Sequence, residues 1–292
     1  MKRGKSRRLF KKKKSHSNQR LGCIIAIIVL IPICYGLYLY YQQYSVQHSS
    51  KTQIETSVSL PTPSGKDLEI PVSLIPRQEQ IIRHKGYTVS YNKDLKIPNW
   101  VSYELTRQET KGKEKRGDNF IADPLVKGAI ATNADYARSG YDKGHMAPAA
   151  DMKWSPDVMK ESFYFSNMCP KHPQLNRRGW KNLEEKIRDW AVADSAIIII
   201  CGPIIDKPSK TIGKNKVAVP ERFFKVILSP FVKPARGIGF LFNNRQAVEP
   251  LSTYAVSIDS IEQLTHMDFF SPLPDEIENA VEANADYYQW PR

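Results

Sequence analysis

Residues 21–41 (LGCIIAIIVLIPICYGLYLYY) form a run of 21 residues without a single charged side chain. As an α-helix this run would be roughly 31 Å long, which matches the hydrocarbon core of a bilayer. Tyrosines gather at its far end, where amphipathic rings favour the membrane interface. A cleavable signal peptide would have a shorter apolar core and a small-residue cleavage site, whereas this run ends in Tyr and Gln. The run therefore predicts a single N-terminal transmembrane helix that serves as a signal anchor.

A basic tail precedes this run. Residues 1–20 contain ten Lys or Arg and no Asp or Glu. The positive-inside rule predicts that such a tail stays in the cytoplasm and that residues 42–292 lie across the membrane. A basic run could also bind RNA or act as a nuclear signal, but beside a spanning helix the membrane topology is the simpler cause.

The rest of the chain is nearly neutral. The net charge is +13, but ten of the 43 basic residues lie in the tail, which leaves 33 against 30 acidic residues. The charge is therefore no argument for nucleic-acid binding by itself. Hydrophobic residues make up 41% of the chain and charged residues 25%, as in ordinary globular proteins, which excludes a disordered or collagen-like chain and a multi-span membrane protein. Residues 42–66 are rich in Ser, Thr and Gln and predict a linker, followed by one domain over 67–292.

The pattern of apolar residues in this domain predicts an α+β fold. Residues 196–201 are a continuous apolar run stopped by Gly-Pro, which is typical of a buried central strand. Apolar residues at intervals of three and four predict a helix over 176–193. Further strands are predicted at 84–91, 100–106, 163–166, 223–228 and 238–242, and short helices within 258–284. We expect a mixed central sheet flanked by helices.

Two segments carry residues suited to catalysis. In the first, residues 139–148, His145 follows Asp142-Lys-Gly. In the second, residues 166–184, Asn176 begins the predicted helix and Glu184 lies two turns further along it. A glycine-rich phosphate loop, a Gly-x-Ser-x-Gly motif, a Cys-x-x-Cys motif and a His-Glu-x-x-His motif are all absent from the sequence.

These segments resemble the DNA/RNA non-specific endonucleases of the ββα-metal fold. The family signature is Asp-Arg-Gly-His, then Asn-x-x-Pro-Gln, then Asn-x-x-x-Trp-x-x-Leu-Glu. The corresponding residues here are Asp-Lys-Gly-His at 142–145, Asn-Met-Cys-Pro-Lys at 167–171 and Asn-Arg-Arg-Gly-Trp-Lys-Asn-Leu-Glu at 176–184. The resemblance extends over about residues 68–284 and implies the ββα-metal nuclease fold behind the N-terminal transmembrane helix.

The resemblance also implies a catalytic set. His145 would be the general base that activates water, because an imidazole titrates near neutral pH. Asn176 would be the protein ligand of one divalent cation, Mg²⁺ or Mn²⁺, which stabilises the leaving 3′ oxygen. Glu184 would orient water around the cation. Arg116 and Lys143 would stabilise negative charge at the phosphate. The expected products carry 5′-phosphate and 3′-hydroxyl ends.

Three further residues are expected to bind the substrate: Asn167, Lys171 and Arg177. Asn167 would also shape the site around the base or the metal. Two positions depart from the family pattern. Lys143 replaces the usual Arg, so a fork of donors becomes a point charge. Lys171 replaces the usual Gln, which puts that contact in doubt.

Several of these residues have simpler interpretations. Asn176 could cap its helix, alone or in addition to binding metal. Glu184 could pair with Arg188 on a solvated helix face. Arg116 lies in a charged run and could belong to a solvated loop. The sequence also leaves open whether Cys169 and Cys201 form a disulfide.

The function expected from the resemblance is a membrane-anchored, metal-dependent endonuclease that cuts DNA and RNA with little sequence specificity. Two alternatives come from other classes: a non-catalytic surface receptor that holds or takes up nucleic acid, and an anchored interaction protein on an inherited fold. The anchor and the bacterial members of the family favour a bacterial inner membrane, with the domain in the periplasm, and a eukaryotic organelle membrane is left open. Dimers occur in the family, so a homodimer is left open.

Overall fold

The computed structural model describes residues 68–205 and 210–291. The predicted tail at 1–20, the predicted anchor at 21–41 and the predicted linker at 42–66 lie outside these residues. Within the part that is described, no helix has both the length and the apolar character needed to cross a bilayer.

The centre of the domain is a seven-stranded sheet with the strand order β12-β11-β10-β7-β4-β3-β2. Every pairing between neighbouring strands in it is antiparallel, so the expectation of a mixed sheet is wrong. A continuous apolar run is typical of parallel strands because these are covered on both faces, but helices on both faces of this antiparallel sheet produce the same pattern. The strands are β2 (Gln80–Arg83), β3 (Thr88–Asn92), β4 (Ile97–Thr106), β7 (Ala196–Ile204), β10 (Arg222–Ser229), β11 (Arg236–Asn243) and β12 (Ala255–Val256).

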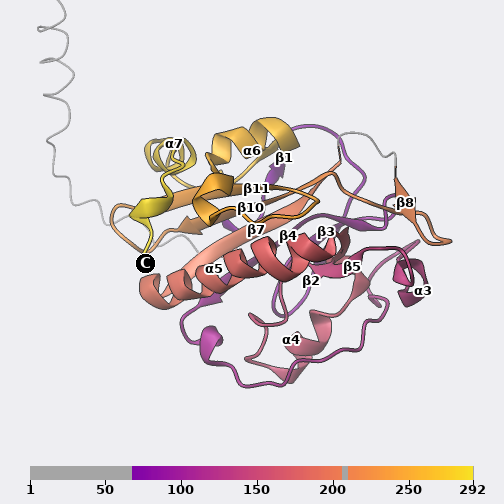
Figure 1. Cartoon of the computed structure of the whole chain (residues 1–292). Helices are drawn as coiled ribbons and strands as arrows, with labels where there is room; N and C mark the ends of the chain where they lie inside the picture. Colours follow the sequence, from indigo (N-terminus) through magenta and orange to yellow (C-terminus); the bar gives the residue numbers. More distant parts are fainter. Residues whose placement is uncertain (1–67, 206–209, 292) are drawn as a thin grey trace, which may run out of the picture. The chain divides into compact units, whose positions relative to one another are not determined.

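Helices cover both faces of this sheet, as Figure 1 shows. The long helix α5 (Trp180–Asp194) lies on one side, and α6 (Ile258–Thr265) and α7 (Asp275–Glu282) lie on the other. Side chains of β7 alternate between the two cores: Ile197 and Ile199 pack on the α5 side, and Ile198 and Ile200 pack on the side of α6 and α7. This double burial explains why the strand is apolar at every position.

The remaining elements are short. They are β1 (Val72–Ser73) paired with β13 (Met267–Asp268), β8 (Thr211–Ile212) paired with β9 (Val217–Ala218), and the short helices η1 (Glu109–Lys111), α3 (Asn133–Tyr136), α4 (Pro156–Glu161), η2 (Phe165–Asn167), η4 (Leu251–Tyr254) and η5 (Tyr287–Gln289).

A separate two-stranded sheet leads into helix α5. Strand β5 (Asp142–His145) pairs antiparallel with β6 (Met168–Lys171), and the chain then enters one π-helical turn, η3 (Leu175–Gly179), which continues into α5. Two strands followed by a helix thus carry both sequence segments. The helix predicted over 176–193 is confirmed.

The strand predicted at 163–166 is wrong. Tyr164 forms only an isolated bridge with Ile121, and a 3-10 turn follows, so the strand begins at Met168 instead. The aromatic run has the composition of a strand, but Phe163 and Phe165 are buried against other aromatic rings rather than alternating between two faces.

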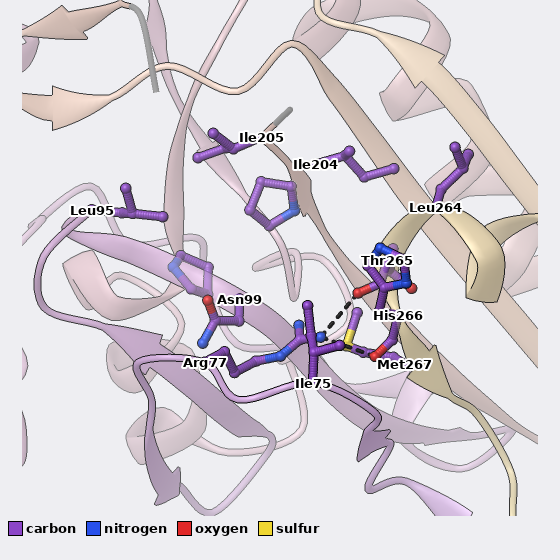
Figure 2. A pocket seen from close by; sticks show the side chains of 12 residues that line it. Ile75, Arg77, Leu95, Asn99, Ile204, Ile205, Leu264, Thr265, His266 and Met267 are labelled. Atoms are coloured by element: carbon purple, nitrogen blue, oxygen red, sulfur yellow. Dashed lines mark hydrogen bonds between the residues drawn. The ribbon is translucent and has the colours of Figure 1, made fainter. Parts of the chain in front are cut away.

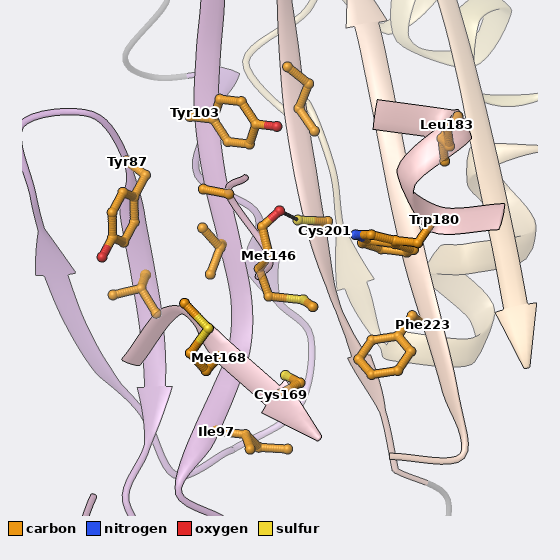
Figure 3. Packing of buried hydrophobic residues seen from close by; sticks show 14 of the residues in the cluster. Tyr87, Ile97, Tyr103, Met146, Met168, Cys169, Trp180, Leu183, Cys201 and Phe223 are labelled. Atoms are coloured by element: carbon orange, nitrogen blue, oxygen red, sulfur yellow. Dashed lines mark hydrogen bonds between the residues drawn. The ribbon is translucent and has the colours of Figure 1, made fainter. Parts of the chain in front are cut away.

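Below the two-stranded sheet, sulfur-containing and aromatic side chains form part of the core (Figure 3). Met168 and Cys169 of β6 belong to the same buried cluster as Met146, Trp180 and Cys201. Both cysteines are free, and the thiol of Cys201 donates to the backbone carbonyl of Met146 at 3.3 Å. The open question of a disulfide is therefore answered in the negative for this structure.

Candidate active site on the two-stranded sheet and its helix

His145 is the last residue of β5, and its side chain is only 8% exposed. The rings of Phe163 and Phe120 enclose it, with centroids 4.9 and 5.6 Å from the imidazole. The Nε2 atom has no hydrogen-bond partner within the described residues. Burial, assisted by the charges of Arg116 and Lys171, lowers the pKa of His145 to about 3. The imidazole is therefore neutral with a free nitrogen, as a general base must be, but it does not titrate near neutral pH as the sequence suggested.

Each of the two predicted cations lies against one of the phenyl rings that enclose this imidazole. The Arg116 guanidinium lies 5.3 Å from the centre of the Phe163 ring, and the Lys143 amine lies 4.1 Å from that of Phe120. The Lys143 amine also donates to the Asn133 side-chain oxygen at 2.8 Å. Arg116 is exposed, so its charge is available to an anion arriving from solvent. Phe120, Phe163 and Asn133 were not predicted from the sequence as site residues. The residue types alone, aromatic and amide, gave no stronger signal.

Asp142, at the start of β5, holds the beginning of the helix. Its carboxylate accepts a hydrogen bond from the Asn176 side-chain nitrogen at 3.1 Å. It also accepts two from Arg177, both at 2.8 Å, although that side chain is 69% exposed. The sequence assigned no chemistry to Asp142. In the structure it couples the strand to the helix across 34 positions of the chain.

This contact determines the orientation of the Asn176 amide. Because the nitrogen donates to Asp142, the side-chain oxygen Oδ1 is the atom left over, and no described residue donates to it. The side chain does not cap η3 either. Asn176 is half-buried, so its oxygen is held in one orientation next to solvent. The amide is therefore suited to bind a cation, and the alternative of a pure helix cap does not hold.

Glu184 is half-buried, two turns along α5. The alternative of a direct ion pair with Arg188 is not found: Arg188 pairs with the buried Asp151 at 2.8 Å, although its charge still acts on Glu184. Burial raises the pKa of Glu184, and the nearby charges of Lys225 and Lys171 oppose this rise. Glu184 is therefore not a solvated surface residue. Its negative charge is close to the buried lysines Lys171 and Lys225 and partly compensates theirs.

Lys171 has a different position from the one expected. Its side chain is completely buried, and its amine donates to the His145 carbonyl at 3.0 Å and lies 3.9 Å from the centre of a Trp180 ring. Burial lowers its pKa to about 7. The prediction of a substrate contact is wrong, since no surface of this side chain is accessible. Lys171 instead supports the backbone of the catalytic strand.

Gly144 makes room for this lysine. A Cβ at position 144 would lie 2.6 Å from the Cβ and 2.8 Å from the Cε of Lys171, closer than carbon atoms approach. The glycine of the motif is thus required by the close passage of Lys171 across β5.

Asn167 is also completely buried, so the predicted direct contact with substrate is wrong. Its side-chain nitrogen donates to the carbonyls of Ala147 and Ser162 at 2.8 and 2.9 Å, and its oxygen accepts from the Ala147 backbone at 2.9 Å. These bonds hold the chain directly after His145. The expectation that Asn167 shapes the site agrees with this arrangement.

The residues at this site fit a hard divalent cation with few protein ligands. The free amide oxygen of Asn176 is a neutral ligand, and no group of three His, Cys, Asp or Glu ligands is found around it among the described residues. Mg²⁺ commonly keeps several waters and takes only one or two ligands from protein. The donor set therefore suits a hard cation such as Mg²⁺ or Mn²⁺ better than Zn²⁺ or Cu²⁺, which prefer imidazole or thiolate.

A pocket of about 240 Å³ elsewhere in the domain contains none of the predicted site residues (Figure 2). It lies between the start of β4, the end of β7 and the turn after α6, and its lining is mostly apolar. The Arg77 guanidinium within it donates to the backbone carbonyls of Thr265 and His266 at 2.9 and 3.1 Å. Because the guanidinium is already hydrogen-bonded to the backbone, it is less available to an anionic substrate. This pocket is therefore a poor candidate for the catalytic site.

Comparison with known proteins agrees with the motif and its geometry. The family model of the DNA/RNA non-specific endonucleases matches residues 64–276. This chain belongs to that family. It is 30% identical to a nuclease of Nostoc sp. over 254 residues, covering 80% of this chain and 89% of the relative. It is 33% identical to human mitochondrial endonuclease G over 213 residues, covering 67% of this chain and 71% of the relative.

The fold is shared as well. A crystal structure of the EndoG/EndoGI complex contains a chain that matches with a TM-score of 0.63 and 29% identity, covering 68% of this chain and 89% of that one. The protein is thus an endonuclease, a hydrolase of phosphodiester bonds. Nucleases of the endonuclease G type are metal-dependent.

Proposed function

We propose that the protein is a membrane-anchored endonuclease that hydrolyses DNA and RNA with little sequence specificity, using His145 as general base and Mg²⁺ as cofactor. The observation that carries the proposal is a neutral, buried His145 with an unpartnered Nε2 atom, enclosed by Phe120 and Phe163 and close to the charge of Arg116. The Asn176 amide, whose nitrogen is held by Asp142 and whose oxygen is left without a donor, supports the metal-binding part.

In this proposal, His145 takes a proton from the attacking water. The water oxygen forms the new bond to phosphorus, the bond from phosphorus to the 3′ oxygen breaks, and the leaving 3′ oxygen takes a proton from solvent water. The products carry 5′-phosphate and 3′-hydroxyl ends. Arg116 and Lys143 hold the scissile phosphate by charge. The arriving phosphate is an anion, and an anion near an imidazole raises its pKa. Substrate binding therefore strengthens the base at the moment it is needed.

Asn176 would hold the cation through Oδ1, and Glu184 would orient water around it. When bound, Mg²⁺ supplies positive charge that stabilises the leaving oxygen. Asp142 keeps the Asn176 amide in the required orientation. Arg177, bound to Asp142 but mostly exposed, is available to contact a neighbouring phosphate.

Low specificity follows from the kind of contacts available. The assigned groups are cations and amides that meet a phosphodiester backbone, which is common to all sequences. The domain carries little excess positive charge, so the local charges of Arg116, Lys143 and Arg177 have to attract the substrate.

The proposed anchor rests on residues 21–41 and on the basic tail before them. In a bacterial host the domain would lie in the periplasm, attached to the inner membrane. Membrane fractionation of the full chain, followed by protease treatment of spheroplasts, tests this. We expect the protein in the membrane fraction and its domain digested from outside; a domain that is protected in intact spheroplasts would contradict the topology.

The catalytic proposal is tested with the full chain in detergent, incubated with supercoiled plasmid and with RNA in Mg²⁺ or EDTA. We expect progressive nicking to short fragments that requires Mg²⁺ and is lost in His145→Ala. His266→Asn is the matched control, because this exposed histidine lies after α6 and its removal leaves the site intact. Intact plasmid with folded wild-type protein would refute the proposal.

The alternative function is a non-catalytic nucleic-acid receptor, which would also use Arg116, Lys143 and Arg177. A gel-shift assay on the same samples in EDTA separates the two functions. Binding without cleavage under every metal condition would favour the receptor. Cleavage that depends on His145 would exclude it.

A further inference from the structure

The C-terminal part of the domain is strongly acidic. Residues 255–284 contain seven Asp or Glu and no Lys or Arg, whereas the rest of the domain has more basic than acidic residues. Folding brings three of these side chains together: Asp259 and Glu262 on α6, and Glu282 at the end of α7. One carboxylate oxygen from each lies within 4.8 Å of the other two. Asp259, Glu262 and Glu282 together form an acidic cluster.

One member of this cluster is a buried carboxylate with an unpartnered oxygen. Glu282 is only 6% exposed, and its Oε1 has no hydrogen-bond partner within the described residues. The neighbouring Glu278 also has a buried oxygen without a partner. Burial, together with the charges of Glu262, Glu278 and Asp259, raises the pKa of Glu282 to about 9. Burying a carboxylate without a compensating partner is costly, so such an arrangement is expected where a cation binds.

The other members of the cluster are fixed in orientations that leave oxygens for a ligand. Glu262 accepts a hydrogen bond from the Phe269 backbone at 2.8 Å through Oε1, so its second oxygen is left for another contact. Asp259 is accessible to solvent at the first turn of α6. No ion pair joins these carboxylates to a Lys or Arg in the described part of the chain. The C-terminal end of a helix carries partial negative charge. Because Glu282 is the last residue of α7, its position also favours a cation.

We propose that the acidic cluster of Asp259, Glu262 and Glu282 is a Ca²⁺ site that joins α6 to α7. Carboxylate oxygens are hard ligands, and Ca²⁺ accepts them in flexible geometry at about 2.3–2.6 Å. Mg²⁺ requires a near-ideal octahedron at about 2.0–2.1 Å and keeps several waters, so a site built mainly from carboxylates favours Ca²⁺. Glu278 and water would complete the six to eight oxygen ligands typical of Ca²⁺.

This site is distinct from the proposed catalytic site. The cluster lies on α6 and α7, on the side of the central sheet opposite α5 (Figure 1). Its expected effect is on stability, since both helices pack on β11 and their buried residues Ile258, Ile261 and Val281 cover one face of the sheet. A cation bound only by the folded chain stabilises it.

The experiment is thermal unfolding of the full chain in detergent, in EDTA, in 1 mM CaCl₂ and in 1 mM MgCl₂. Glu282→Gln removes the central ligand charge while keeping its size. Glu276→Gln is the matched control, because Glu276 is an exposed acid on the same helix and outside the cluster. Asn176→Ala removes the metal ligand of the proposed catalytic site, so a Ca²⁺ effect at that site is recognised.

For wild type, Glu276→Gln and Asn176→Ala, we expect CaCl₂ to raise Tm by about 5 °C over EDTA, with a smaller rise in MgCl₂. In Glu282→Gln we expect the Ca²⁺ response to be lost. Its Tm in EDTA should equal or exceed that of wild type, because a neutral amide avoids the cost of protonating a buried carboxyl group on folding, and this shows that the variant folds. The proposal is overturned by an unchanged wild-type Tm in CaCl₂, by an undiminished response in Glu282→Gln, or by loss of the response in Asn176→Ala.

Discussion

Replacing His145 with glutamine tests whether the imidazole is buried in its neutral form. The pKa of this side chain is about 3 in the folded protein, against an ordinary value of 6.5. Between these two pH values the unfolded chain takes up a proton at His145 that the folded chain does not. Stability therefore falls as pH falls through this window, and it is fully retained only above pH 6.5.

The size of the effect follows from the same two values. Each pKa unit corresponds to about 1.4 kcal/mol, so the loss reaches about 5 kcal/mol once the pH is near 3. At pH 5, about 2 kcal/mol of this is already lost relative to pH 8. This part of the drop in unfolding free energy arises from protonation of the imidazole alone. It should therefore disappear in His145→Gln, whatever the effect of that substitution on stability at pH 8.

The assay is urea unfolding of wild type and His145→Gln at pH 8 and pH 5, in EDTA. We expect the drop in the free energy of unfolding to be about 2 kcal/mol larger for wild type than for the variant, with equal m-values. Carboxylates that titrate over this range contribute equally to both proteins and cancel in the comparison. His266→Asn should keep the wild-type drop, since His145 is retained. The same drop in wild type and His145→Gln would refute the reasoning.

Three further predictions concern the residues around the histidine. Asn176→Ala should reduce Mg²⁺-dependent plasmid cleavage by at least about 100-fold, and a binding assay in EDTA should show unchanged DNA affinity. Asp142→Asn should raise the Mg²⁺ concentration for half-maximal cleavage by roughly 10- to 100-fold, because the Asn176 amide and Arg177 lose their anchor; an unchanged Mg²⁺ titration would contradict this role. Gly144→Ala should cost about 1–3 kcal/mol in urea unfolding, because its Cβ collides with Lys171. Unaltered stability would show that Lys171 moves freely.

The sequence by itself determined the elements with strong periodicity and the ordered motif. The apolar run at 196–201 and the helix over 176–193 follow from burial patterns that depend on local sequence. The motif residues His145 and Asn176 were recognisable because their types and spacing match a known chemistry. The antiparallel direction of the strands was not recognisable, because a strand buried on both faces is apolar whatever the direction of its neighbours.

Only the tertiary structure decided which polar residues of the motif face solvent. Lys171 and Asn167 have the composition of substrate contacts, yet both are completely buried, where they hold the backbone at and after His145. Asp142 gained its role from a contact 34 residues away along the chain. The low pKa of His145 arises from enclosure by Phe120 and Phe163 and from nearby charges. Burial and long-range contacts depend on how distant segments pack, and that information is absent from any local pattern.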